Sequence, residues 1–281
     1  MRFVAIDLET ANARMSSICQ IGLVAFENGI EVGSDVRLIN PNDHFDCINI
    51  SIHGIDEAAV KSAPSFQQSH DWLSNWLMDE VTICHTHFDR VALAQAYAEH
   101  GNTHPSCRWI DSARVSRRVW PQYAKSGYGL ANIASDFGIA FQHHDAVEDA
   151  RAAGLIFAKA MAESDTTLDH WLAASTYKSS STSASVRREG DGDGPLVGES
   201  IVFTGALQIS RSEAADSAHE AGAAVEAGVT KHTTILVVGD QDVARLAGKS
   251  KSSKHIKAES LIAKGQNLRI LAESDFLAFL S

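Results

Sequence analysis

A stretch between Ser175 and Gly194 constrains the fold of this chain more than any other feature of its sequence. It is rich in serine, threonine, glycine and charged residues, with runs such as Ser-Ser-Ser-Thr-Ser and Gly-Asp-Gly-Asp-Gly. Few of these side chains can be buried, so no packing energy offsets the entropy lost on ordering the backbone. A chain of 281 residues is long enough for two cores. We therefore predict a domain at 1–163, a flexible linker at 164–195 and a second domain at 196–281.

Charge and composition exclude some classes of protein. The formal net charge of −11 argues against a general nucleic-acid coat, which would be basic, but suits an enzyme that gathers carboxylates around cations. No run of about 18 apolar residues occurs, so we expect no membrane span, and the apolar start is too short for a signal peptide. The four cysteines lack metal-site spacing. We expect them to be thiols in the cytoplasm.

The segment before the stretch alternates between strand and helix patterns. The expected strands are 3–6, 18–26, 36–39 and 81–84, and the expected helices are 66–77, 89–100 and 146–161. Asp145 and Glu148 have the spacing of a capping box at the start of the last helix. Three meandering strands, followed by strands that alternate with helices, predict an α/β fold with a mixed sheet and flanking helices.

A shorter βαββαβα pattern follows the stretch. The expected strands are 200–203, 224–225, 234–238 and 268–271, and the expected helices are 211–221, 254–264 and 273–280. This pattern predicts a small α/β domain.

Two acids lie at the end of the first predicted strand, in the run Asp7-Leu8-Glu9-Thr10. Alternation along a strand places Asp7 and Glu9 on one face, so the two carboxylates project together. An acid at the end of an apolar strand is costly unless a positive group meets it. A solvated strand end is the alternative interpretation.

A further acid, Asp89, follows the strand at 81–84 within the run His-Thr-His-Phe-Asp. Asp89 would begin the next helix, where a carboxylate stabilises the N-terminus without any catalytic role. The run also resembles the His-x-His-x-Asp-His zinc motif of metallo-β-lactamase-like hydrolases. Arg90 replaces the last histidine of that motif, however, and such a fold leaves Asp7 and Glu9 unexplained.

A third group of residues lies around the start of the helix at 146–161. His144 comes just before this helix, and Asp149 falls in its second turn, near the same end. A flexible histidine beside a rigidly held acid suits a metal site that needs a base next to its nucleophile. Either residue alone is unremarkable, because a surface histidine before a helix is usually only solvated.

The three groups together reproduce the order of a known exonuclease site. The residues that match are Asp7, Glu9, Asp89, His144 and Asp149. They resemble the four carboxylates and the histidine of the DEDD exonucleases in their histidine-bearing branch (DEDDh), the family of the bacterial DNA polymerase III epsilon subunit and ribonuclease T. The resemblance covers about residues 1–162, and includes Ile-His-Gly-Ile at 52–55 and Tyr-Gly-Leu at 128–130.

The resemblance implies a ribonuclease-H-like fold that hydrolyses DNA from its 3′ end to nucleoside 5′-monophosphates. Hard cations prefer carboxylate oxygens, so the four acids would hold two Mg²⁺ or Mn²⁺ ions. Ions about 3.5–4 Å apart can hold both the attacking and the leaving oxygen. His144 would be the base, with His143 as the runner-up because its six-residue spacing to Asp149 departs from the family's five. Thr10 and Phe88 would contact the substrate.

The second motif departs from the family pattern. Family members usually place asparagine and two further residues between the histidine and Phe-Asp. Here that interval is one residue shorter, with Thr86 at the place of the asparagine. Asp89 remains the expected ligand, but the local loop and its substrate contacts are in question.

The second domain carries the motifs Val-Phe-Thr-Gly at 202–205, Ala-Gly-Ala at 221–223 and Ile-Leu-Val-Val-Gly at 235–239. They resemble the BRCT domains of NAD-dependent DNA ligases and of the large subunit of replication factor C. The tryptophan usual in the last helix is absent, with Phe276 in its region. The resemblance implies a phosphate pocket of hydroxyl, backbone N–H, guanidinium and ammonium groups. Its residues would be Thr204, Gly205, Arg211 and Lys254. The alternative is that the two cations are only solvated.

The resemblances predict an exonuclease whose partners are DNA 3′ ends. The BRCT domain would bind either 5′-phosphorylated nicks and gaps or a replication or repair protein. Two alternatives stay open. One is an exoribonuclease acting on RNA, because the carboxylate site does not discriminate sugars. The other is a BRCT adaptor with an inactive nuclease domain, although the five-residue set is complete.

Overall fold

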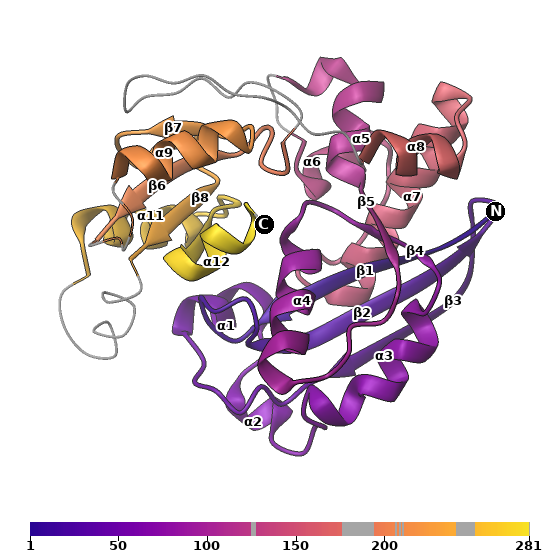
Figure 1. Ribbon diagram of the computed structural model, residues 1–281, viewed down its shortest axis with the longest axis horizontal. Helices are drawn as coiled ribbons and strands as arrows, with labels where there is room; N and C mark the ends of the chain where they lie inside the picture. The colour runs from indigo at the N-terminus through magenta and orange to yellow at the C-terminus, as the bar shows by residue number, and fades with distance from the viewer. Residues whose placement is uncertain are drawn as a thin grey trace. The chain divides into compact units, whose positions relative to one another are not determined.

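The computed structural model describes residues 1–124, 128–175, 194–205, 207, 209, 211–239 and 251–280. The chain divides into two compact units, Met1–Thr176 and Tyr177–Ser281, which Figure 1 colours from indigo to yellow along the chain. Most of the predicted linker, at 176–193, lies outside the described residues. No helix within the described ranges is long and apolar enough to cross a membrane. All four cysteines are free thiols, as expected from their spacing.

The first unit is built on a mixed sheet, which confirms the predicted fold class. Its strands are β1 (Arg2–Thr10), β2 (Ile18–Glu27), β3 (Ile30–Leu38), β4 (Val81–Cys84) and β5 (Arg108–Asp111). They lie in the order β3-β2-β1-β4-β5; β1 pairs antiparallel with β2 and parallel with β4. Because β1 is bonded on both sides, the position of its C-terminal end is fixed by two neighbours.

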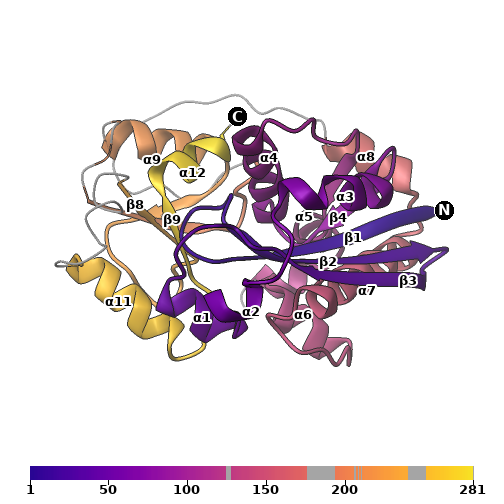
Figure 2. The same cartoon turned by 90° about the horizontal axis from the view of Figure 1, so that it is seen from below.

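Helices cover both faces of this sheet (Figure 2). They are α1 (Cys47–His53), α2 (Glu57–Val60), α3 (His70–Leu77), α4 (Phe88–His100), α5 (Ser112–Val119), α6 (Leu130–Asp136), α7 (Ala146–Ser164) and α8 (Leu168–Ser175). Short 3₁₀ turns occupy Gln67–Ser69 and Pro121–Ala124. The helix predicted at 66–77 therefore begins as a 3₁₀ turn. In Figure 2, α7 lies on one side of β1 and β2, and α3 and α4 lie on the other.

One face of β1 carries an apolar stripe that ends in the two acids. Phe3 and Ala5 are fully buried in the core that includes α7. The ring of Phe157 meets that of Phe3 edge-on at a centroid distance of 5.3 Å, and burying such a ring contributes roughly 1.5–3 kcal/mol. Alternation continues the same face to Asp7 and Glu9. The packing that holds α7 on β1 therefore also positions the two carboxylates beneath the start of that helix.

The start of α7 is held by a side-chain cap and by close packing. Asp145 accepts hydrogen bonds from the N–H groups of Val147 and Glu148, which satisfies donors that a helix start leaves unpaired. The predicted capping box is only half formed, because the carboxylate of Glu148 instead bonds to Arg151. The guanidinium of Arg151, one turn further along the helix, is the partner of Glu148 in place of the backbone N–H of Asp145.

The predicted linker begins too early in the sequence. Residues 168–175 form α8, and the side chain of Trp171 is buried in the core of the first unit. Its indole N–H donates to Thr166 Oγ1 at 2.8 Å. Leu168, Leu172 and Ala174 pack against the same core, so several apolar side chains anchor this helix. The chain up to Ser175 therefore belongs to the first unit.

The second unit is a small α/β structure with a parallel sheet among its described residues. Its strands are β6 (Ser200–Thr204), β7 (Ala224–Glu226), β8 (Ile235–Val238) and β9 (Arg269–Ala272). Its described helices are α9 (Arg211–Glu220), α11 (Ser253–Ile262) and α12 (Glu273–Ala278). The sheet order β7-β6-β8-β9 places β6 and β8 at the centre. These elements agree with the predicted βαββαβα pattern, and the end of β6 adjoins the start of α11 through Thr204 and Ser252.

Candidate active site

Three carboxylates meet at the C-terminal end of β1. One oxygen of each of Asp7, Glu9 and Asp149 lies within 4.8 Å of the others. Asp7 and Glu9 come from β1, and Asp149 comes from the first turns of α7. The side chain of Asp149 is 4% exposed and that of Glu9 is 12% exposed. Like charges in such a place repel one another strongly, so the arrangement favours a bound cation.

Asp89 approaches the same strand from α4. It is 2% exposed, and its Oδ1 accepts the N–H of Leu8 at 3.1 Å. Leu8 stands between the two acids of β1. The fourth predicted carboxylate therefore adjoins the group of three, tied to the backbone between them.

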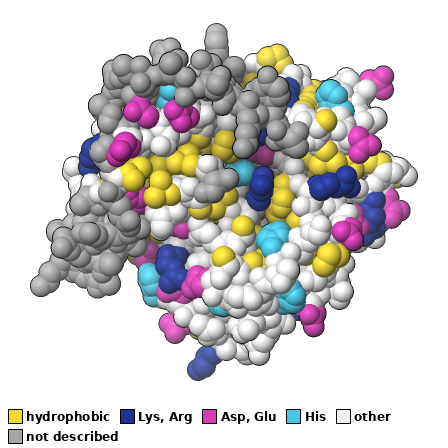
Figure 3. Space-filling view, in the orientation of Figure 1, with side chains coloured by type: hydrophobic (Ala, Val, Ile, Leu, Met, Phe, Trp, Pro, Cys, Tyr) yellow, Lys and Arg dark blue, Asp and Glu magenta, His cyan; other side chains and the backbone are white. Residues whose placement is uncertain are grey.

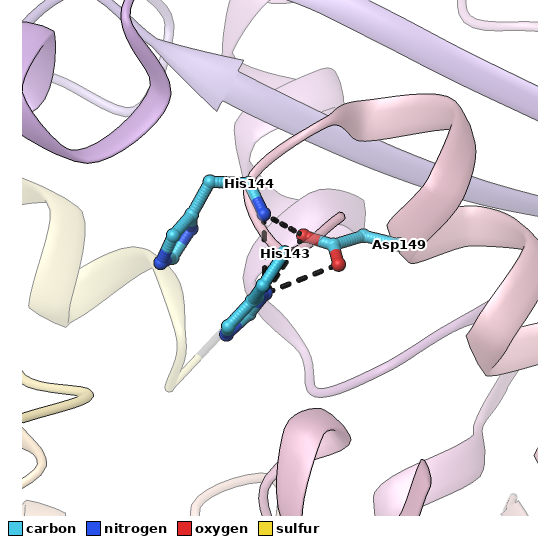
Figure 4. Close-up of side chains that lie close together, drawn as sticks. All are labelled: His143, His144 and Asp149. Atoms are coloured by element: carbon cyan, nitrogen blue, oxygen red, sulfur yellow. Dashed lines mark hydrogen bonds and ion pairs between the residues drawn. The ribbon is translucent and has the colours of Figure 1, made fainter. Parts of the chain in front are cut away.

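The two consecutive histidines lie beside Asp149 (Figure 4). His143 Nδ1 lies 3.1 Å from both carboxylate oxygens of Asp149 and 3.2 Å from the backbone nitrogen of His144. The backbone N–H of His144 donates to Asp149 Oδ2 at 2.9 Å, and its Nδ1 lies 3.8 Å from Glu9 Oε1. The structure thus places the predicted base, His144, over the carboxylates, and gives the runner-up, His143, a direct bond to one of them.

The short loop after β4 closes through a left-handed turn at Thr86, whose φ is +87°. Its N–H donates to Asp111 Oδ1, which also caps α5. His85 is bonded through both ring nitrogens, Nδ1 to Ser112 Oγ and Nε2 to the carbonyl of Tyr128. These bonds remove His85 as a zinc ligand, so the metallo-β-lactamase-like alternative is wrong.

Thr10, a predicted substrate contact, has its carbonyl held by two side chains of α1. Asn49 Nδ2 donates to the Thr10 carbonyl at 2.9 Å, and His53 Nε2 donates to it at 3.1 Å. The tautomer of His53 is fixed because its Nδ1 accepts the N–H of Ile55. Burial lowers the pKa of His53. The Ile-His-Gly-Ile segment thus pins the end of β1, which carries Glu9. Phe88, the other predicted contact, begins α4.

The donor set suits hard divalent cations. Mg²⁺ and Mn²⁺ prefer carboxylate oxygens, and Asp7, Glu9 and Asp149 can each supply one within a small volume. A single buried Asp149 without a cation nearby would be costly, whereas a group of three around an ion is not. The residues present therefore fit such an ion.

In the second unit, two cations converge at the end of β6. Lys254 Nζ and Arg211 Nη1 both donate to the carbonyl of Phe203, at 3.0 and 2.9 Å. Arg211 Nη2 reaches the carbonyl of Gly205, and Thr204 Oγ1 lies 2.9 Å from Ser252 Oγ. Burial, and secondarily Arg211, lowers the pKa of Lys254. The four predicted pocket residues are therefore neighbours.

Two residues that position the site were missed in the sequence. Gly22 is the cross-strand partner of Asp7, and a Cβ built on it would lie 2.2 Å from the backbone of Ala146. Gln20 Oε1 accepts the N–H of Ala146 at 3.2 Å. A glycine within a strand pattern is a known sign of close backbone approach, so Gly22 carried a signal. Gln20 carried none.

The first unit is similar to known exonucleases. A protein-family model described as "Exonuclease" (RNase_T) matches residues 4–157. A structure of a 3′-exonuclease that recognises the 3′ end of a histone mRNA stem-loop is 14% identical, with a TM-score of 0.50, and the match covers 58% of this chain and 82% of that one. At this identity the likeness concerns the fold alone, which is ribonuclease-H-like. Exonuclease X in complex with 5′-overhanging duplex DNA is 20% identical, with a TM-score of 0.49, over 61% of this chain and 98% of that one.

Two kinds of curated relative match parts of the chain. A PolC-type DNA polymerase III of Caldanaerobacter subterraneus subsp. tengcongensis is 27% identical over 160 residues, which are 56% of this chain and 11% of the relative. A DNA ligase of Oleidesulfovibrio alaskensis is 40% identical over 84 residues, which are 30% of this chain and 10% of the ligase. The chain thus spans about a tenth of the length of these curated relatives.

Proposed function

This chain belongs to the exonuclease (RNase T) family, and on that premise we propose that it is a DEDDh exonuclease that removes nucleoside 5′-monophosphates from DNA 3′ ends. Family membership makes it a nuclease, a hydrolase that acts on nucleic acid. The observation that carries the proposal is the meeting of Asp7, Glu9 and Asp149 within 4.8 Å, with His144 Nδ1 3.8 Å from Glu9. The five-residue spacing between His144 and Asp149 supports the DEDDh type.

DNA is the favoured substrate because the curated relatives are a DNA polymerase and DNA ligases. The binding surface need not be a broad basic one. Among the side chains coloured in Figure 3, Lys and Arg are interspersed with Asp and Glu, in keeping with the net charge of −11. Attraction for the phosphates would then come from cations at the carboxylate cluster.

In the proposed mechanism, Asp7, Glu9, Asp89 and Asp149 would hold two Mg²⁺ or Mn²⁺ ions. When bound, such ions lower the pKa of water and offset the charge that develops on the phosphate. An imidazole nitrogen of His144 takes the proton of the attacking water, as suits a group with an ordinary pKa of about 6.5. Thr10 and Phe88, which flank Glu9 and Asp89 in the sequence, would orient the terminal nucleotide.

The test uses the full chain with 5′-labelled and 3′-labelled oligonucleotides of DNA and RNA, in Mg²⁺, Mn²⁺ or a chelator. We expect stepwise shortening of 5′-labelled DNA, dependence on the metal, and immediate release of the 3′ label as a mononucleotide. Asp7→Asn should lower turnover at least about 10³-fold, or roughly 4 kcal/mol of barrier. Faster degradation of RNA would favour the exoribonuclease. A folded, metal-saturated chain that degrades neither would favour an inactive adaptor.

For the second unit we propose a BRCT domain at 196–281 whose pocket binds a DNA 5′-phosphate. The length of the ligase match, 84 residues, is close to that of this segment. Arg211 and Lys254 direct their donors to one carbonyl at the end of β6, beside the hydroxyl of Thr204. Guanidinium and ammonium groups gathered in this way bind phosphate oxygens well. A bound 5′ end would raise the concentration of nearby 3′ ends for the nuclease.

A double substitution tests this pocket in the full chain. Arg211→Ala/Lys254→Ala should raise KM on nicked or gapped duplexes with a 5′-phosphate, while kcat on short single strands hardly changes. Lys257→Ala, on the exposed side of α11, is the matched control for lost charge. The wild-type advantage should fade with added salt, because phosphate contacts release counterions. Equal KM for phosphorylated and dephosphorylated nicks in wild type would instead favour a protein partner.

A further inference from the structure

Helix α5 carries an arginine face, formed by Arg114, Arg117 and Arg118, that the proposed reaction does not use. The helix contains these three arginines and no acid, in a chain whose formal net charge is −11. The arginines follow the i, i+3, i+4 spacing that places side chains on one side of a helix. The buried residues of α5 lie on the other side: Ser112, Ala113, Val115 and Ser116. Arg118 is exposed and the other two arginines are half-buried, so α5 presents three guanidinium groups at the surface.

The arginine face begins beside the candidate active site. Strands β1, β4 and β5 are parallel neighbours, so their C-terminal ends lie along one edge of the sheet. Asp111 Oδ1 accepts the N–H of Thr86 at 3.1 Å and that of Arg114 at 3.2 Å. This shared oxygen ties the start of α5 to the loop that leads to Asp89. A helix of eight residues is about 12 Å long, so the face leads away from the edge that holds the carboxylates.

An aromatic ring orients the middle arginine of the face. Arg117 Cζ lies 5.3 Å from the centroid of the Tyr128 ring, the geometry of a cation–π contact. The carbonyl of Tyr128 in turn accepts a hydrogen bond from His85 Nε2 at 2.9 Å, so the residue that supports the guanidinium is itself fixed. A guanidinium held over a ring keeps N–H donors for a second partner. Such donors can bind a bidentate acceptor such as a phosphate group.

The backbone of a nucleic acid strand fits this face. Guanidinium groups bind phosphate oxygens through parallel N–H bonds, and α5 has no acid that would repel a phosphate. Arg114 and Arg118 stand about 6 Å apart along the helix axis, whereas a strand carries one phosphate per about 3.4 Å of duplex. The face therefore spans about two phosphates. Cations at the carboxylate cluster would hold the phosphate that is cleaved, so phosphates further from the 3′ end need partners elsewhere.

We propose that the arginine face of α5 binds the phosphodiester backbone of the strand that is degraded, on the 5′ side of its terminal nucleotide. This inference rests on the proposed function and makes the length of the strand a determinant of substrate choice. Backbone contacts carry no sequence information, so the gain in affinity is the same for all sequences of one length. A dinucleotide is too short to engage the face, whereas a strand of about ten nucleotides is about 34 Å long and reaches beyond α5.

Binding measured in a chelator tests the face without hydrolysis. The full chain is titrated against fluorescent DNA single strands of about ten nucleotides over a range of NaCl concentrations. The strands carry a 5′-hydroxyl, which offers the second unit no 5′-phosphate. For single strands, log K falls with log salt by about 0.7 for each phosphate neutralised. Arg114→Gln/Arg118→Gln should therefore make this fall less steep by about 1.4, which is about a 25-fold loss of affinity at 0.1 M salt relative to 1 M.

Two controls separate charge from other effects. Arg114→Lys/Arg118→Lys keeps both charges and should keep the wild-type salt dependence. Arg2→Gln removes a cation at the opposite end of β1, where the side chain is 46% exposed, and should also leave the salt dependence unchanged. A wild-type salt dependence in the glutamine double variant would overturn the proposal. The same loss in the lysine double variant would overturn it too, because the arginines would then act through the fold and not through their charge.

Hydrolysis assays separate this inference from the proposed function. The glutamine double variant should raise KM on the longer strand by the factor measured in binding, with little change in kcat, and should match wild type on a dinucleotide. If the salt dependence falls in this variant but the chain hydrolyses nothing, the proposed function fails and the strand contact stands. If hydrolysis occurs and the variant has the wild-type KM on both lengths, the strand contact fails and the function stands. An equal loss on both lengths would also overturn the strand contact.

Discussion

Replacing Gly22 with alanine is expected to move the start of α7 away from β1 and loosen the carboxylate cluster. An ideal Cβ at this position would lie 2.2 Å from the carbonyl carbon and oxygen of Ala146 and 2.3 Å from the nitrogen of Val147. Ordinary contacts begin near 3.4 Å, so the helix must retreat by about an ångström. All three atoms belong to the backbone, and no rotamer change can absorb the overlap.

The expected effect on function is larger than the effect on stability. Overpacking of this kind costs about 1–3 kcal/mol, of which about 0.4–1 kcal/mol is offset because alanine restricts the unfolded chain. A 1 Å displacement within a catalytic site, by contrast, can cost about 10²-fold in rate. Gly22 pairs directly with Asp7, while α7 carries Asp149, so the displacement separates two of the three clustered acids. We therefore expect weaker Mn²⁺ binding and a lower kcat, with little change in KM.

Alanine substitutions of two other glycines serve as controls. Gly33 in β3 has nothing within 4 Å of its Cβ direction, so Gly33→Ala reports the backbone effect alone. A Cβ on Gly154 would meet the ring of Phe26 at 2.2 Å, so Gly154→Ala disturbs α7 further from the acids. Urea unfolding, Mn²⁺ calorimetry and hydrolysis would be measured on all three variants. The reasoning fails if Gly22→Ala keeps wild-type Mn²⁺ affinity and kcat, or if Gly154→Ala lowers both as much.

Three further outcomes are expected. His144→Ala should reduce kcat more than His143→Ala does, because only the base takes up a proton in the reaction; steady-state assays at saturating metal would show the reverse order if the roles are exchanged. Since burial lowers the pKa of Lys254, the affinity of the full chain for inorganic phosphate should fall with rising pH earlier in wild type than in Lys254→Arg, and superimposable pH profiles would contradict the pocket. Burial also lowers the pKa of His53, so its contribution to stability is complete above the unfolded pKa of about 6.5 and is lost as pH falls through the folded pKa. In His53→Gln, the free energy of unfolding should therefore change less with pH in this range, by up to about 1.4 kcal/mol per pH unit. Urea unfolding at several pH values measures this slope, and an unchanged slope would exclude this histidine.

Local sequence patterns predicted most of the secondary structure. Alternation in β1 placed Asp7 and Glu9 on one face because a strand has a period of two, and the start of α7 followed from the capping residue Asp145. Such features depend on neighbours in sequence and need no knowledge of the fold. The mixed sheet with flanking helices also followed from the succession of strands and helices, whereas the order of its strands came from the structure.

The proximity of Asp149 to Asp7 could not be predicted from the residues next to either acid in the sequence. The physical arguments for each acid stood separately, and only the resemblance to a family joined them before the fold was known. In the structure they meet because α7 crosses over β2 at Gly22, where a missing side chain lets two backbones approach. The distance between the acids is therefore set by a residue that carries no chemistry itself.

Interactions between distant segments also determined two features that the sequence patterns did not predict, the packing of α8 and the contact of His143 with Asp149. The linker was predicted to begin at residue 164, but the ring of Trp171 is buried in the core of the first unit and α8 packs there. The six-residue spacing between His143 and Asp149 argued against His143 as the base, yet in the structure His143 Nδ1 lies 3.1 Å from both carboxylate oxygens of Asp149. Sequence alone determined which residues were chemically able to act and on which local face they lay. Tertiary structure decided which of them touch, because contacts across 100 or more residues depend on how whole elements pack.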